Sequence, residues 1–136
     1  MPKKKILIID DHADTRLLVS AYLKTHRYDT VFAADALQAI SAARQAKPDA
    51  IILDLGLPGG HGLIVLERLK ANIVLRTIPV IILTADESPE SELKGLKAGA
   101  AAFLRKPVQE QALITAVDCA FSALAECPIT DTVTQR

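Results

Sequence analysis

The sequence predicts an α/β fold in which helices cover both faces of a parallel sheet. Five short apolar runs alternate with five longer segments of helical periodicity along the 136 residues, and this alternation is typical of a parallel sheet. The runs are almost continuously hydrophobic, as expected of strands that are buried on both faces. Half of the residues are hydrophobic, and a chain of this length fits one globular domain.

The five strands follow from composition and from the turn residues that end each run. They are expected at 4–10, 28–33, 49–53, 79–83 and 101–104. The second run is the least regular in its alternation, but it carries Tyr, Thr, Val and Phe, which favour strands. Pro79 is tolerated because it stands at the start of its strand.

Five helices are predicted between and after these strands. The first spans 14–25, Asp35 is expected to cap the second, Ser88–Pro89 opens the fourth, and Pro107 opens the fifth. Apolar residues at helical spacing are expected to face the core. They are Leu17, Leu18, Ala21 and Tyr22 in the first helix, Leu37, Ile40 and Ala43 in the second, Leu63, Leu66, Leu69 and Ile73 in the third, Leu93 and Leu96 in the fourth, and Leu113, Ile114, Val117, Phe121 and Leu124 in the fifth.

Acidic residues stand where two of the predicted strands end. Asp10 and Asp11 close the first run, and Asp54 follows the third. In a doubly wound sheet these ends can meet at the point where the strand order reverses, which is where ligands bind. Three neighbouring carboxylates repel one another, and a hard cation such as Mg²⁺ would neutralise them and accept phosphate oxygens. Each acid alone is explained equally well as a turn or N-cap residue.

A hydroxyl and an ammonium follow the remaining strands at the same edge of the sheet. Thr84 ends the fourth strand, and Lys106 follows the fifth, directly before Pro107. An anion could be held between these two side chains. Taken separately, Thr84 is a strand-end residue with a local hydrogen bond and Lys106 is a surface lysine. Their combination with the acids favours a phosphate site.

Together these positions resemble the receiver domain of two-component response regulators. The resemblance covers residues 3–125 and is carried by Asp10, Asp11, Asp54, Thr84, Lys106 and Pro107. It implies a flavodoxin-like doubly wound (βα)5 fold whose five-stranded parallel sheet has the order 2-1-3-4-5. Residues 126–136 are then expected to form a short C-terminal tail.

The resemblance also implies a role for each residue of the expected phosphate site. Asp54 matches the acceptor of a phosphoryl group from a histidine kinase or a phosphotransfer protein. Thr84 and Lys106 match the residues that bind the phosphoryl oxygens. Phe103 matches the switch aromatic, which turns inward when Thr84 moves, and the Lys106–Pro107 peptide bond is expected to be cis.

The implied metal is Mg²⁺, or Mn²⁺ in its place. Asp11 and Asp54 match direct ligands, Asp10 a ligand acting through water, and Gly56 a ligand through its backbone carbonyl. Phosphoryl transfer depends mainly on positioning and on neutralising charge, so this set of residues suits the reaction. Since Gly56 brings no side chain beside the acceptor, we expect the lifetime of the phosphoryl group to be set elsewhere.

The expected output is a signalling switch and not a conventional turnover enzyme, although Mg²⁺-dependent self-phosphorylation and autodephosphorylation are implied. Phosphorylation should alter a partner-binding face made by the fourth helix, fifth strand and fifth helix. The small apolar stretch 100–102 makes a charged dimer at this face less expected, which leaves a monomer or a weak phosphorylation-dependent dimer. The chain is either a stand-alone protein or a receiver cut from a longer response regulator or hybrid kinase.

The composition of the chain limits the classes of partner that we expect and indicates its cellular compartment. Lysines and arginines equal the acids in number, so direct nucleic-acid binding is not expected. No apolar run is long enough for a membrane span, and the N-terminus lacks a signal-peptide pattern, so we expect a cytoplasmic protein. Cys119 and Cys127 are accordingly expected to be reduced.

Other functions fit the residues less well. An aspartate-nucleophile phosphatase usually carries a second acid two residues after its nucleophile, where this chain has Gly56. A flavin or dinucleotide binder needs a Gly-rich or hydroxyl-rich loop after the first strand, where Asp10, Asp11 and His12 stand. An interaction module without phosphorylation would typically lose one of the key residues, and all are present. His12 and His61 could serve as a phosphohistidine or as a metal ligand, but they are interpreted as exposed loop histidines.

Overall fold

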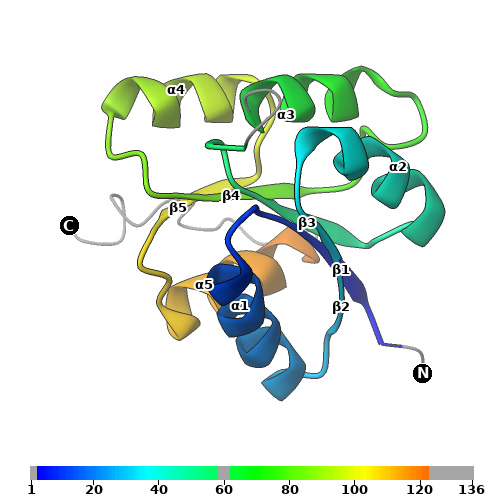
Figure 1. Ribbon diagram of the computed structural model, residues 1–136, viewed down its shortest axis with the longest axis vertical. Helices are drawn as coiled ribbons and strands as arrows, with labels where there is room; N and C mark the ends of the chain where they lie inside the picture. Colours follow the sequence, from blue (N-terminus) through cyan, green and yellow to red (C-terminus); the bar gives the residue numbers. More distant parts are fainter. Residues whose placement is uncertain (1–2, 58–61, 123–136) are drawn as a thin grey trace.

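The computed structural model describes residues 3–57 and 62–122, which form a five-stranded sheet between two layers of helices (Figure 1). The strands are β1 (Lys5–Ile9), β2 (Asp29–Ala33), β3 (Ala50–Leu53), β4 (Val80–Thr84) and β5 (Ala102–Arg105). The helices are α1 (Ala13–Thr25), α2 (Ala36–Ala46), α3 (Gly62–Ala71), α4 (Pro89–Lys97) and α5 (Glu110–Ala120). The predicted tail at 126–136 lies outside the described residues.

All neighbouring strands are parallel, and their order is β2-β1-β3-β4-β5. The predicted doubly wound topology is therefore confirmed. The order reverses between β1 and β3, where Ile9 pairs with Leu53. The next residues along the two strands, Asp10 and Asp54, are consequently brought to the same edge of the sheet.

Two apolar cores lie on opposite faces of the sheet. Successive side chains of a strand point to opposite faces, so Ile6 and Ile8 pack with α1 and α5, and Leu7 and Ile9 pack with α2 and α3. Figure 1 shows α1 and α5 on one side of the sheet and α2, α3 and α4 on the other. Because both faces are covered, the strands tolerate the continuous hydrophobic runs from which they were predicted.

The predicted helix ends are close to the observed ones because local hydrogen bonds fix them. The Asp35 side chain accepts from the backbone N–H of Gln38 at 2.8 Å, and Ser88 accepts from that of Ser91 at 3.1 Å. These are the N-caps expected from the sequence. Helix α5 begins at Glu110 and not at Pro107, because Lys106 and Pro107 form a bend and Gln109, the N-cap, still has extended backbone.

Several residues predicted to face the core are instead exposed: Leu17, Leu18, Ala21, Leu37, Ile73 and Leu93. Helix α1 packs through Val19 and Leu23, and α2 packs through the small residues Ala39 and Ala43. Small side chains let a helix lie close to the sheet, so the largest apolar residues do not mark the buried side. For the last predicted helix, Leu113, Ile114 and Val117 are buried as expected, and Leu124 lies outside the described residues.

Two further observations concern membrane spans and the state of Cys119. No helix in the described part of the chain is both long and apolar enough to cross a membrane. Cys119, on α5, is disulfide-bonded, so the expectation of a reduced thiol at this position is wrong. That expectation came from the presumed compartment and not from any contact of the side chain.

Candidate functional site

The three predicted acids meet at the carboxyl edge of the sheet, where the strand order reverses. Backbone bonds continue the sheet one residue past each strand: Asp10 N–H donates to Ala33 O at 3.1 Å, and Asp54 N–H donates to Ile9 O at 2.9 Å. Asp10 and Asp54 are 3% and 4% exposed, whereas Asp11 is exposed. The site therefore has two buried carboxylates on a rigid backbone and a third facing solvent.

Lys106 lies between the two buried acids. Its Nζ is 3.0 Å from Asp10 Oδ2 and 3.1 Å from Asp54 Oδ2. Burial lowers the pKa of Lys106, but hydrogen bonds and charge attraction from Asp10 and Asp54 outweigh burial, and its pKa is raised. The lysine thus stays a cation and offsets part of the negative charge at the site.

The backbone around Lys106 positions its side chain. Its N–H donates to Thr84 O at 2.8 Å, which ties the segment after β5 to the end of β4. The Lys106–Pro107 peptide bond is cis, the geometry that the resemblance led us to expect.

Four residues of the edge offer ligand atoms that all lie within 4.8 Å of one another: Asp10, Asp11, His12 and Asp54. Carboxylate oxygens predominate, and they are the ligands that hard divalent cations prefer. The Gly56 backbone lies over the same place, because its N–H donates to Asp54 Oδ1 at 3.0 Å. The donor set therefore fits the divalent metal that the sequence predicts, and it includes the imidazole of His12, which was interpreted from the sequence as an exposed loop histidine.

Thr84 and Phe103 connect the acidic edge to α4. Thr84 is buried at the end of β4, and its Oγ1 accepts from the Asp86 N–H at 3.3 Å. The Phe103 ring is fully buried. A Cβ on Gly95 of α4 would lie 3.5 Å from this ring, which shows how closely the helix packs over it.

An ion pair fastens α4 to β5 beside the aromatic ring. Arg105 Nη2 and Glu92 Oε1 are 3.0 Å apart, and both side chains are largely buried. The Arg105 guanidinium also lies over the Phe103 ring, 5.2 Å from its centroid. Such a cation–π contact adds to the attraction. No role was predicted for either residue of this pair from the sequence.

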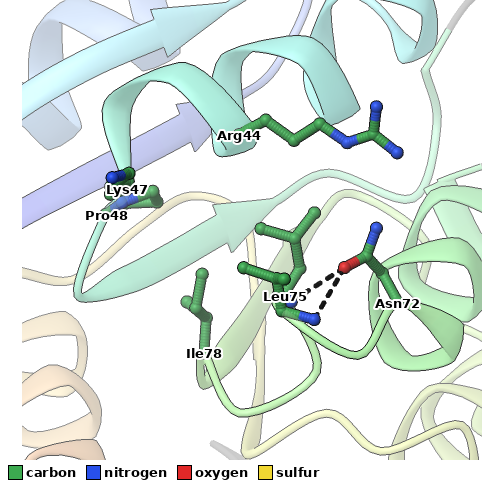
Figure 2. Close-up of a pocket in the computed structure, with 7 residues that line it drawn as sticks. Arg44, Lys47, Pro48, Asn72, Leu75 and Ile78 are labelled. Carbon is green, nitrogen blue, oxygen red and sulfur yellow. Dashed lines mark hydrogen bonds between the residues drawn. The ribbon is translucent and has the colours of Figure 1, made fainter.

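A cleft of about 520 Å³ lies at the opposite end of the sheet (Figure 2). It separates the end of α2 from the loop between α3 and β4. Its lining residues are Arg44, Lys47, Pro48, Asn72, Val74, Leu75 and Ile78. Asn72 is engaged in that loop, since its Oδ1 accepts from the backbone N–H groups of Val74 and Leu75. No acid lines this cleft, and it is remote from the candidate site.

The order of the strands, the paired acids and the lysine between them match one protein family. A family model described as the response regulator receiver domain matches residues 6–118. The chain belongs to this family. Receiver domains are signalling switches that bind Mg²⁺ in an acidic pocket and interact with histidine kinases and effectors.

Curated relatives extend beyond the receiver domain. The chain is 32% identical to the DNA-binding response regulator MtrA of Mycobacterium leprae over 115 residues, which are 85% of this chain and 50% of that protein. It is 29% identical to the phosphate regulon transcriptional regulatory protein PhoB of Escherichia coli over 130 residues, or 96% and 57% of the two chains. The receiver domain thus spans about half the length of these relatives.

Solved structures agree on the fold. A putative response regulator from Chloroflexus aurantiacus has a TM-score of 0.83 at 29% identity, covering 87% of this chain and 97% of that one. The chemotaxis response regulator CheY4 of Vibrio cholerae has a TM-score of 0.81 at 28% identity, covering 88% and 99%. The flavodoxin-like fold predicted from the sequence is thereby confirmed.

Proposed function

We propose that this receiver domain is the phosphoacceptor switch of a two-component system and that Asp54 is the acceptor. One observation carries the proposal: the buried Asp54 carboxylate lies 3.1 Å from Lys106 Nζ and shares the edge with two further acids. If the Lys106–Asp54 pair served only to stabilise the fold, it would not require two further acids beside it. It would also not need to lie where the strand order of the sheet reverses. A carboxylate so placed is fixed in position beside a cation that can pair with phosphoryl oxygens.

The chemistry is a single phosphoryl transfer. An Asp54 carboxylate oxygen attacks the phosphorus of a phosphohistidine, an O–P bond forms, and the N–P bond breaks. The departing imidazole keeps the electron pair of that bond and takes up a proton, and Asp54 becomes an acyl phosphate. Lys106 pairs with an oxygen of the transferred group, and the Thr84 hydroxyl binds another. Water reverses the modification by hydrolysing the acyl phosphate.

A divalent metal completes the proposal, with Mg²⁺ first and Mn²⁺ in its place. Asp11, Asp54 and the Gly56 carbonyl would hold it, with Asp10 acting through water. When bound, the metal supplies positive charge that offsets the acids and the phosphoryl oxygens. In its absence Lys106 alone faces the carboxylates, which would repel an anionic donor.

The surface next to Asp54 suits a docking protein. Leu18 on α1, which is exposed, lines a small cleft together with Lys106, Pro107 and Val108. Exposed apolar residues that surround a reactive group favour protein contact over solvent contact. We propose that a histidine kinase or a phosphotransfer protein docks here.

The output face is proposed to be α4, β5 and α5, with Thr84 and Phe103 as the local switch. Movement of Thr84 toward a phosphoryl group would release Asp86 and disturb the packing of α4 on Phe103. The partner would be a downstream protein, and a monomer or weak phosphorylation-dependent dimer is expected. Direct binding of nucleic acid by this domain and contact with a membrane are not proposed, and the cytoplasm is the proposed location.

The test is the intact mass of the protein after incubation with a small phosphodonor, with and without Mg²⁺. A Mg²⁺-dependent phosphoryl adduct is expected in the wild type and in Asp29→Asn, an exposed acid at the far end of β2. Asp54→Asn should give none. An adduct that persists in Asp54→Asn would show that the acceptor is wrong. The absence of any adduct, even with kinase present, would favour an interaction module without phosphorylation.

A further inference from the structure

His12 belongs to the acidic cluster through its side chain as well as its position in the sequence. Its Nδ1 lies 3.2 Å from Asp10 Oδ1 and 3.3 Å from Asp11 Oδ1. Its backbone N–H also donates to Asp10 Oδ1, at 2.8 Å. The ring therefore faces the carboxylates, although 63% of the side chain is exposed.

Among the described residues, the polar atoms of the imidazole contact only these acids, and its Nδ1 lies within hydrogen-bonding distance of Asp10 Oδ1 at 3.2 Å. His12 stands at the N-cap of α1, but its side chain makes no capping hydrogen bond. Ser, Thr, Asp or Asn would cap the helix better at this position. Arg16 secures the loop independently, since its Nη1 donates to Asp10 O at 2.7 Å. The orientation of the ring is thus set by the acids that it faces.

The separation of the ligand atoms is close to that of a coordination shell. All four atoms lie within 4.8 Å of one another. Two ligands on opposite sides of a small divalent ion stand about 4.2 Å apart, from metal–ligand bonds of about 2.1 Å. If the largest separation between these ligand atoms shortened by roughly half an ångström, His12 Nδ1 and the carboxylate oxygens could bind one ion together. An exposed side chain next to a helix start can make that movement.

We infer that His12 is a nitrogen ligand of this metal site and directs its preference from Mg²⁺ toward first-row transition-metal cations. The inference rests on the proposed function, because it concerns the same metal. Mg²⁺ takes oxygen ligands and keeps several waters, so an imidazole adds little to its binding. Transition-metal cations accept imidazole readily, and their affinity for a mixed oxygen and nitrogen site rises from Mn²⁺ to Ni²⁺.

The first experiment measures metal affinity by calorimetry, with Mg²⁺, Mn²⁺ and Co²⁺ as probes, for the wild type, His12→Asn and His12→Gln. Loss of a ligand should weaken Co²⁺ and Mn²⁺ binding by about ten- to a hundredfold, as losses around metal sites do. Mg²⁺ affinity should change by less than about threefold, because its shell does not need the ring. His26→Asn is the matched control, since His26 follows the far end of α1 and pairs with Glu110 at 3.3 Å.

The second experiment is a pulsed electron paramagnetic resonance measurement on the Mn²⁺-loaded protein. A nitrogen coupling typical of a coordinated imidazole is expected in the wild type and in His26→Asn, and its absence is expected in both His12 variants. A coupling that persists in the His12 variants, or an equal loss of Mg²⁺ and Co²⁺ affinity, would overturn the inference. In either case Mg²⁺-dependent phosphorylation of Asp54 would still stand. If the wild type binds none of the three metals, both the inference and the proposed metal fail.

Discussion

Replacing Asp54 by asparagine should stabilise the protein when no metal is bound. The wild-type edge holds three carboxylates and one ammonium, which leaves an excess of two negative charges. Asp54→Asn keeps the shape of the side chain and removes one of these charges. Lys106 retains Asp10 as its partner at 3.0 Å, so the substitution leaves no unpaired buried cation.

The magnitude follows from the distances. The attraction between Asp54 and Lys106 at 3.1 Å is worth about 5 kcal/mol at an effective dielectric constant of about 20. Repulsion from each of the other acids, at no more than 4.8 Å, is at least about 3.5 kcal/mol on the same scale. Solvent screens the contribution of exposed Asp11, so attraction and repulsion nearly cancel. The cost of burying the Asp54 charge, several kcal/mol, then decides the sign.

The expected result is an increase of about 1–3 kcal/mol in the free energy of unfolding, after allowance for the buried amide of the asparagine. Urea denaturation followed by circular dichroism in the presence of a chelator measures it. Saturating Mg²⁺ should stabilise the wild type by about 2.7 kcal/mol at a hundred times the dissociation constant and the variant by much less. Asp29→Asn, a surface control, should change stability by less than about 0.5 kcal/mol.

The reasoning would be refuted by a loss of stability of more than about 1 kcal/mol in the chelator, since the attraction to Lys106 would then exceed repulsion and burial cost combined. A gain that survives unchanged at saturating Mg²⁺ would show that the metal does not bind through Asp54.

Two other substitutions test how the site is built. A Cβ on Gly62 would lie 2.3 Å from the Asp54 backbone oxygen, so Gly62→Ala should destabilise by about 3 kcal/mol or more and lower the melting temperature. Gly56→Ala should melt normally, since its Cβ would lie 3.7 Å from Asp54 Oδ1, which is ordinary contact. The pKa of Asp86 is lowered mainly by a hydrogen bond from the Ser91 side chain, and next by one from the Ser88 backbone N–H. Ser91→Ala should therefore raise that pKa in an NMR titration, and an unchanged value would contradict the assignment. A carboxyl group whose pKa is lower in the folded state stabilises the protein at pH values above its unfolded-state pKa. The difference in unfolding free energy between the wild type and Ser91→Ala should therefore vanish as the pH falls through the folded-state pKa of Asp86.

Much of the fold could be predicted because the information is local. Each strand is an apolar run closed by turn residues, and the caps at Asp35 and Ser88 depend on hydrogen bonds within three residues. The position of Asp10 and Asp54 after two such runs was enough to place them at one edge, since parallel strands end together. The strand order itself came from the family resemblance and not from these patterns.

The buried faces of α1 and α2 could not be obtained in the same way. Leu17, Leu18 and Leu37 are exposed, whereas Ala39, which was not predicted to face the core, is buried beside the correctly predicted Ala43. A helical repeat shows which residues share a side of the helix, but the direction in which the helix docks depends on the partner surface. Here close approach to the sheet favours small side chains over large ones.

The sequence by itself determined the sheet, its edge and the residue types gathered there, because strand periodicity and turn chemistry act over a few residues. Only the tertiary structure decided which charges meet. The bonds from Lys106 to Asp10 and Asp54 join β5, β1 and β3, three strands that are far apart in the chain. The turn of His12 toward its acidic neighbours and the pairing of Glu92 with Arg105 likewise depend on side-chain directions fixed by packing. Such contacts span a few ångströms in space and leave no periodic signal in a sequence.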